Sequence, residues 1–276
     1  MKLMNRLFSL ILLLLPMMSF ANGKILATPG VSQVEGSGGG GLVPWAQLAG
    51  YATEDEIAFS AFCSQANVKD FQLNSCGGQI NFYDRVEFSF AKQNFQVDPL
   101  SLTLSQDILG LKVRLYGDLV YSTWPQLSVG IQHKSLTTAD VAFSLGAKDD
   151  TGTDIYLAAS KLHLGLLAGY NVLWNATARY TKANEMGLLG FSGPKGNGAL
   201  QTEMSVAVLI NKHLAVGTEY RHKPDNLGLG EDDWQDVFVA WFPNKHFNVT
   251  LAYLNLGTIA ALADQKGWYL SLSGSY

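Results

Sequence analysis

The last nine residues of the chain, 268–276, alternate between two kinds of side chain. Trp268, Leu270, Leu272 and Tyr276 share one face, and small or polar residues occupy most positions between them. A period of two is typical of a β-strand whose two faces meet different surroundings. The sequence therefore predicts that the chain ends in a strand with one apolar and one polar face.

The same alternation continues over long stretches in the rest of the chain. It is clearest in 126–134, 200–210, 214–221 and 163–181, where every second residue is apolar. Strands of soluble sheets average ~5–6 residues, whereas a strand that crosses a membrane needs ~9–11. The lengths predict an all-β chain built from membrane-crossing strands.

The first residues have the pattern of an export signal. Lys2 and Arg6 precede an apolar run at 7–15, and Ser19 and Ala21 place small residues at the cleavage-recognition positions. An uncleaved anchor is the alternative, but the run is shorter than the ~20 residues of a spanning helix. We interpret 1–21 as a cleaved signal peptide and 22–276 as the mature barrel domain.

Charge and composition narrow the class of protein. The chain has 19 Lys+Arg and 23 Asp+Glu, and removal of Lys2 and Arg6 leaves 17 against 23, a net charge of −6. That balance argues against a nucleic-acid partner, which requires a basic surface. Charged residues make up only 15% of the chain and Gly numbers 28, which suits a surface in lipid. An exported soluble β-sandwich is the alternative.

Short polar reversals alternate with longer connections along the chain. Reversals at 84–85, 124–125, 161–162, 211–212 and 244–245 separate longer segments such as 65–73, 135–152 and 183–199. Outer-membrane barrels have this organisation, with short periplasmic turns and long extracellular loops. We predict a closed antiparallel transmembrane β-barrel of about 14 strands, or 12 if the Gly-rich segment 22–41 is not a first strand but an insert in the lumen.

Strand parity predicts which polar side chains face the lumen. Both signs of charge occur in this set, so the side chains either line a water-filled pore or pair across the interior and close it. The predicted lumen-lining residues are Glu87, Lys112, Arg114, Gln132, Lys134, Arg179, Glu203, Glu219, Arg221 and Asp236.

Two further features have structural consequences. The segment 187–191 is apolar for a loop, and we expect Leu188, Leu189 and Phe191 to fold inward and narrow the pore. Cys63 and Cys76 lie on consecutive predicted strands that flank 65–73. In an oxidising compartment such a pair predicts a disulfide, with two free thiols as the alternative.

Several stretches carry a resemblance to known proteins. The terminal strand resembles the closing strand of bacterial outer-membrane barrels, which the barrel-assembly machinery reads, although Gly274 stands where a bulky apolar residue is usual. The runs 219–227, 231–234 and 240–246 resemble an uncharacterised family of exported, outer-membrane β-barrel proteins of proteobacteria. The resemblance implies no catalytic or ligand residues.

Three classes of function agree with these observations. The first is a porin-like pore or transporter for small solutes in the cell outer membrane, in contact with lipid and lipopolysaccharide. The second is a structural or partner-binding barrel with a closed lumen. The third is a lipid-modifying enzyme, which we do not expect because no Gly-x-Ser-x-Gly element occurs. We expect no cofactor and no metal site, since the histidines lack metal-ligand spacing.

Overall fold

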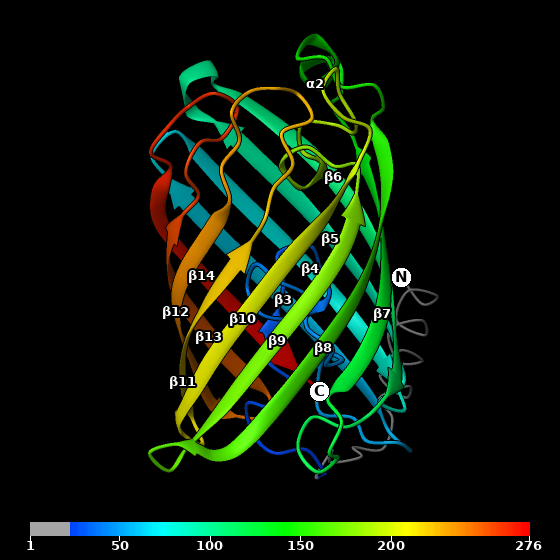
Figure 1. The fold of residues 1–276 in the computed structure, drawn as a ribbon, viewed down its shortest axis with the longest axis vertical. Helices are drawn as coiled ribbons and strands as arrows, with labels where there is room; N and C mark the ends of the chain where they lie inside the picture. Colours follow the sequence, from blue (N-terminus) through cyan, green and yellow to red (C-terminus); the bar gives the residue numbers. More distant parts are fainter. Residues whose placement is uncertain (1–22) are drawn as a thin grey trace, which may run out of the picture.

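The computed structural model describes residues 23–276, so the predicted signal peptide, 1–21, lies outside the described residues. Twelve antiparallel strands form one closed barrel, in the order β3 to β14 (Figure 1). The strands are β3 Ile57–Val68, β4 Phe71–Phe82, β5 Val86–Val97, β6 Leu102–Tyr116, β7 Gln126–Leu136, β8 Thr151–Leu167, β9 Tyr170–Thr181, β10 Ala199–Asn211, β11 Leu214–Arg221, β12 Trp234–Asn244, β13 Phe247–Asn255 and β14 Lys266–Ser275.

The remaining elements are short. Strands β1 Val31–Ser32 and β2 Gly38–Gly39 pair with each other inside the barrel, and the helices are η1 Asp98–Leu100, α2 Asp140–Ser144 and η2 Glu185–Gly187. Within residues 23–276, no helix is long and apolar enough to cross a membrane.

The barrel closes through its first and last wall strands. Strand β14 pairs with β3 from Gly267 to Ser275, and Phe59 and Tyr276 exchange both backbone hydrogen bonds at 2.7 Å. Closure leaves no strand edge unpaired, which is the condition for a sheet in hydrocarbon. The C-terminal strand therefore forms half of the seam.

The strand count corrects the preferred prediction of 14 and agrees with the alternative of 12. Residues 24–34, which would have supplied the first of 14 strands, do not join the wall. Three other boundaries also differ. Residues 65–73 are strand on both sides of a two-residue turn, the β8–β9 reversal lies at 168–169 instead of 161–162, and the short reversal predicted at 124–125 is the end of a longer connection, 117–125. Alternation continues through the first two of these points, so periodicity alone could not locate those turns.

The two ends of the barrel differ in the length of their connections. At the turn end, four of the five connections are short: 83–85, 168–169, 212–213 and 245–246. Asn211 and Asn244 each accept a hydrogen bond from the backbone N–H two residues on, at 2.7 and 2.8 Å, which stabilises two of these turns. The loop end carries the longer segments 137–150, 182–198, 222–233 and 256–265.

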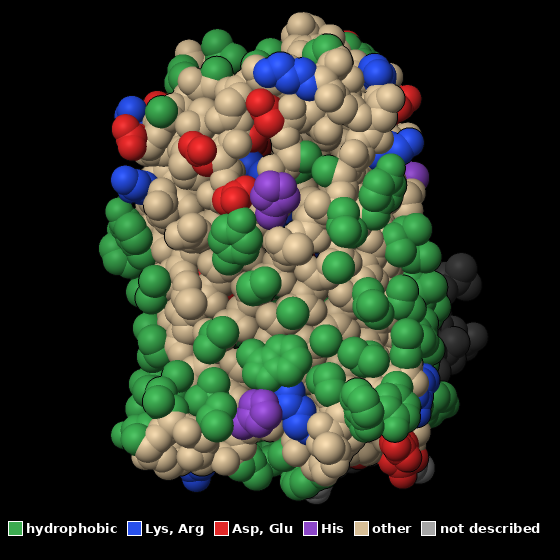
Figure 2. Space-filling view, in the orientation of Figure 1, with side chains coloured by type: hydrophobic (Ala, Val, Ile, Leu, Met, Phe, Trp, Pro, Cys, Tyr) green, Lys and Arg blue, Asp and Glu red, His purple; other side chains and the backbone are tan. Residues whose placement is uncertain are grey.

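The outer surface is apolar around the middle of the barrel. Figure 2 shows hydrophobic side chains along the waist, with charged side chains gathered towards the two ends. The face predicted for the terminal strand points outward: Trp268 and Tyr276 are more than half exposed, and Leu270 and Leu272 nearly so. This is the alternation of apolar-out and polar-in that membrane barrels show.

Residues 23–56 enter the barrel from the turn end and fold inside it, and we call this segment the plug. It appears as the blue chain enclosed by the lower half of the barrel in Figure 1. Every residue from 31 to 52 is buried. The N-terminal segment is therefore an insert in the lumen, the alternative to a first strand that the sequence left open.

Candidate functional site

The predicted lumen-lining residues all point into the barrel. Nine of them are at most 4% exposed, and Arg114 lies at the turn end, where its side chain is 13% exposed and pairs with Asp84 and Asp118. The nine are Glu87, Lys112, Gln132, Lys134, Arg179, Glu203, Glu219, Arg221 and Asp236. What they contact inside the barrel decides between the open and closed interpretations.

Five consecutive strands carry charges of alternating sign on the inner wall, which we call the charged arc. Lys134 of β7, Asp154 of β8, Arg179 of β9, Glu203 of β10 and Arg221 of β11 follow one another around the barrel. Neighbours pair at 2.7 to 3.4 Å. The arc holds three cations and two anions, so by itself it has one positive charge in excess.

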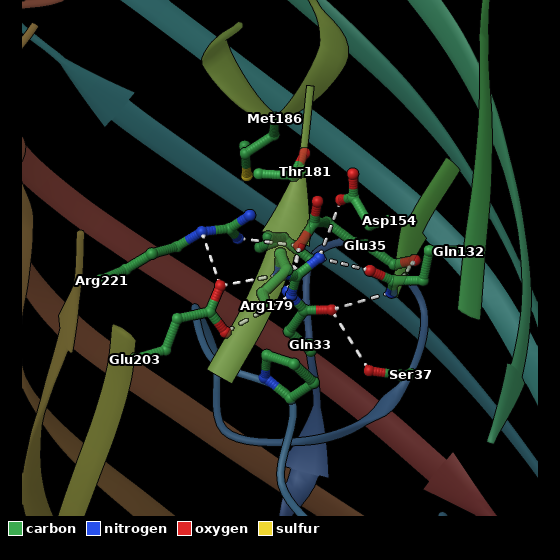
Figure 3. Close-up of polar contacts among 12 residues, drawn as sticks. Gln33, Glu35, Ser37, Gln132, Asp154, Arg179, Thr181, Met186, Glu203 and Arg221 are labelled. Carbon is green, nitrogen blue, oxygen red and sulfur yellow. Dashed lines mark hydrogen bonds and ion pairs between the residues drawn. The ribbon is translucent and has the colours of Figure 1, made fainter. Parts of the chain in front are cut away.

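The plug supplies the missing negative charge. Glu35 is fully buried and contacts all three cations: Lys134, Arg221 at 2.8 Å and Arg179 at 3.3 Å (Figure 3). Charge-assisted hydrogen bonds of this kind are about twice as strong as neutral ones. Glu35 therefore neutralises the charged arc and fixes the plug against it.

Polar groups around the arc hold its members in position. Gln132 accepts a hydrogen bond from Arg179 at 2.7 Å, and the ring of Tyr156 lies 5.4 Å from the same guanidinium. Gln33 of the plug donates to Glu35 at 2.5 Å. A buried ionic network needs such additional partners to offset the loss of hydration.

The plug backbone binds a second ion pair on the neighbouring strands. Glu87 of β5 accepts the N–H groups of Gly38 and Ala49 at 3.0 and 2.6 Å, while Lys112 of β6 donates to the carbonyls of Gly38 and Gln47 at 2.7 Å. The two side chains lie 3.3 Å apart. Irregular buried backbone has no ladder partners, so wall side chains must satisfy it.

A third contact shows why the plug is rich in glycine. Glu219 of β11 accepts the N–H of Leu42 at 2.6 Å and also binds Ser205. A Cβ at Gly40 would lie 1.8 Å from the Glu219 carboxylate, so any other residue would displace it. Glycine permits this close approach of backbone to wall.

Neutral side chains of the wall bind several other plug carbonyls. Gln79 binds the carbonyl of Gly36 at 2.7 Å, and the carbonyl of Ala46 accepts hydrogen bonds from Gln126 and Ser128. Below the plug, a cavity of about 210 Å³ opens at the turn end beside Lys24, Arg114 and other polar residues. The plug is thus fixed laterally, with space on the side from which it enters.

Loop 182–198 covers the plug at the loop end. Leu188, Leu189 and Phe191 are at most 3% exposed, and the first two belong to the apolar core that also holds Val34 and Leu42 of the plug. The structure therefore places the three residues of the predicted constriction inside the molecule, where they pack over a filled lumen.

A small ionic cluster joins this loop to loop 222–233. Lys223 pairs with Glu185 and, at 2.8 Å, with Glu231. Burial raises the pKa of Glu185 well above its ordinary value. The charge of Glu231 acts in the same direction, whereas the charge of Lys223 opposes the increase. Burial also acts upward on Glu231, but a hydrogen bond from Glu185 and the charge of Lys223 lower its pKa. The two pKa values therefore shift in opposite directions, so Glu185 keeps its proton to a higher pH than Glu231.

Cys63 and Cys76 form a disulfide on the outer face of the wall. They stand directly opposite each other on β3 and β4, with 4.1 Å between their Cα atoms. Both side chains are exposed to the surroundings of the barrel. The bond fixes the register of the β3–β4 hairpin and does not close a long loop.

Each histidine side chain makes a polar contact with another residue. Within the described chain, no group of three His, Cys, Asp or Glu side chains is arranged to hold a metal ion. The histidine pairs are His133 with Thr153, His163 with Trp174, His213 with the carbonyl of Phe242, His222 with Asp233 and His246 with the carbonyl of Ser275.

Two members of the ionic network were absent from the predicted set. Asp154 lies just beyond the predicted connection 135–152, and strand parity counted back from Tyr156 on β8 includes it. Glu35 has no regular pattern around it. Its one signal is that it is the sole acidic residue between Lys24 and Tyr51, in a segment otherwise suited to burial.

The fold and the filled lumen define a plugged β-barrel of the outer-membrane type. Similar solved structures include the KdgM porin, at 8% identity over 79% of this chain and 99% of that one with a TM-score of 0.50. Omp33 of Acinetobacter baumannii matches at 8% identity over 81% and 100% with a TM-score of 0.49. An outer membrane channel from Pseudomonas putida F1 matches at 12% over 79% and 94% with a TM-score of 0.47.

These identities make the likeness one of fold. The chain belongs to the family described as protein of unknown function (DUF3034), which it matches over residues 28–273. The match confirms the resemblance to an uncharacterised barrel family that the sequence motifs indicated. The comparison with curated proteins finds no match.

Proposed function

We propose that the protein is an outer-membrane barrel that provides a gated path for small solutes, and that the plug is the gate. A closed wall with an apolar exterior and a charged interior supports this placement and this role. The proposal is one of transport and not of catalysis. Lipid and lipopolysaccharide would surround the barrel, and the terminal strand would be read by the assembly machinery.

One observation carries the proposal: the charged arc of the wall keeps one positive charge in excess, and Glu35 of the plug neutralises it. A lumen designed solely to be filled would balance its own charges, because an unpaired buried charge is costly. Here the balance depends on Glu35, which belongs to a segment that could leave through the end at which it enters. A wall of this kind remains polar and charged when the plug moves.

Planar-bilayer conductance tests the proposal. The mature wild-type protein is compared with Glu35→Gln, which removes the plug's charge at nearly constant shape, and we expect the variant to open more often. The matched control is a protein in which a new disulfide can lock the plug. It carries Ala46→Cys and Ala158→Cys, and the native cysteines are removed by Cys63→Ser and Cys76→Ser. Ala46 of the plug and Ala158 of β8 share one buried cluster, so oxidation locks the plug and should abolish conductance, and reduction should restore it.

The second candidate is a structural barrel with a permanently closed lumen. It is favoured by the apolar packing of Leu42 of the plug with Leu188 of the covering loop and Trp234 of β12. If wild type, Glu35→Gln and the reduced cysteine variant all fail to conduct, including after deletion of residues 183–199, the transport proposal is wrong and this second function stands.

A further inference from the structure

The contacts of Glu35 have the composition of a ligand site. Its two carboxylate oxygens meet wall donors from three alternate strands: Lys134 of β7, Arg179 of β9 and Arg221 of β11. All three donors are cations and all are at most 3% exposed. Arginine and lysine arranged in this way are the usual recognition elements for a carboxylate.

The site would persist without Glu35. Each cation keeps an anionic neighbour on the wall: Lys134 has Asp154 at 2.7 Å, while Arg179 and Arg221 share Glu203 at 2.7 and 3.4 Å. These neighbours hold the donors in place while leaving a single positive charge uncompensated. A singly charged group restores neutrality, whereas a phosphate dianion would make the arc negative.

The position of the site places it on the path of a solute. It spans five of the twelve strands, and Met186 of the covering loop lies on its loop-end side in Figure 3. The plug reaches it from the opposite end. A solute that crosses the barrel after the plug withdraws must therefore pass the three cations.

We propose that Lys134, Arg179 and Arg221 form a carboxylate-binding site, that Glu35 occupies it in the closed state, and that the carboxylate of a transported solute replaces Glu35. This inference rests on the proposed gated path and names the class of solute. Glu35 acts as an internal competitor, so a carboxylate solute both opens the path and is selected by it.

Chemical rescue tests the site without relying on conductance. The mature Glu35→Ala protein is refolded in detergent with sodium acetate, with sodium chloride at equal ionic strength, or with neutral acetamide. We expect acetate alone to raise the melting temperature, by about 4 °C at saturation. Ser37→Ala, in the same turn of the plug, is the matched control and should show no acetate dependence. Adding Lys134→Gln to Glu35→Ala should abolish the rescue.

A second measurement uses the wild-type protein. In bilayers, acetate should increase the open probability over chloride at equal ionic strength, by about tenfold if it offsets 1.4 kcal/mol of plug binding. Equal melting temperatures of Glu35→Ala in acetate and chloride would overturn the site. If that variant does not refold under any condition, equal open probabilities of the wild type would overturn it. Rescue by acetate in a protein that never conducts would refute the gated path and leave the site intact.

Discussion

Two of the contacts between the plug and the wall differ in kind. Against β7–β11, one carboxylate, that of Glu35, binds three cations. Against β4 and β5, neutral side chains such as Gln79 and Gln93 bind single carbonyl groups of the plug backbone. The contact with the charged arc concentrates its stabilisation in one plug residue, whereas the neutral contacts divide theirs among many. A change to Glu35 should therefore affect the plug more than a change to any single neutral side chain.

The largest expected effect comes from removing the plug's carboxylate. Glu35→Ala leaves the buried positive charge uncompensated, and loss of one partner of a buried ion pair costs about 3–5 kcal/mol. Denaturant unfolding of the detergent-solubilised protein measures the loss. Glu35→Gln should cost less because it keeps hydrogen-bonding capacity. A loss no greater than that of a neutral contact would remove the distinction between the two kinds of contact.

Adding a side chain at Gly40, where the plug backbone lies close to Glu219, should have the next largest effect on stability. In Gly40→Ala the new methyl group would lie 1.8 Å from the Glu219 carboxylate, and relief of such overlap costs about 1–3 kcal/mol. Gly274→Ala is the control, because a Cβ there meets nothing nearer than 3.6 Å. Equal stability of the two variants in the same unfolding assay would show that the plug is not held tightly at this point.

A single substitution among the neutral contacts should lower the stability of the protein only slightly. Gln79→Ala removes one hydrogen bond to the carbonyl of Gly36, worth about 1 kcal/mol. Its effect should couple moderately to that of Glu35→Ala in the double variant, since the two contacts share no partner but hold adjacent plug residues. A double-mutant cycle measures the coupling, and strong coupling would show that the two contacts act as one.

The smallest effect is a pH dependence at the covering loop. Burial raises the pKa of Glu185, so ionisation of this residue destabilises the folded loop. The loss of stability begins as the pH rises above the ordinary carboxyl pKa and is complete above the raised pKa of Glu185. The pKa of Glu231 is lowered, so its stabilisation is lost as the pH falls through that value. The loop should therefore loosen as Glu185 ionises with rising pH, measured by proteolysis within 182–198. Glu185→Gln should abolish this dependence, and an unchanged pH profile in that variant would contradict it.

The wall could be predicted from the sequence because its information is local. Alternation at Leu127, Val129 and Ile131 assigns a face to every neighbour on β7, and Lys134 lies buried on the inner face that this parity predicts. The plug could not be predicted in this way. The place of Glu35 depends on cations some 100 to 190 residues later in the chain, and its glycine-rich surroundings have no period that relates it to them.

The strand count failed for a related reason. The segment 24–34 is apolar enough for a strand, but a lumen that must be filled offers it an equally dry environment. Composition cannot distinguish burial in lipid from burial inside a barrel, because both exclude water.

The seam between β3 and β14 has a consequence for the order in which the protein forms. Every other wall pairing joins strands that are neighbours in sequence, so successive hairpins can add one by one. The seam joins Ser60 to Ser275 and must wait for the whole chain, which makes it the slow, long-range step. Until it forms, the sheet has two edges with unpaired backbone groups and is prone to aggregate, and the pairing of β14 with β3 removes that hazard.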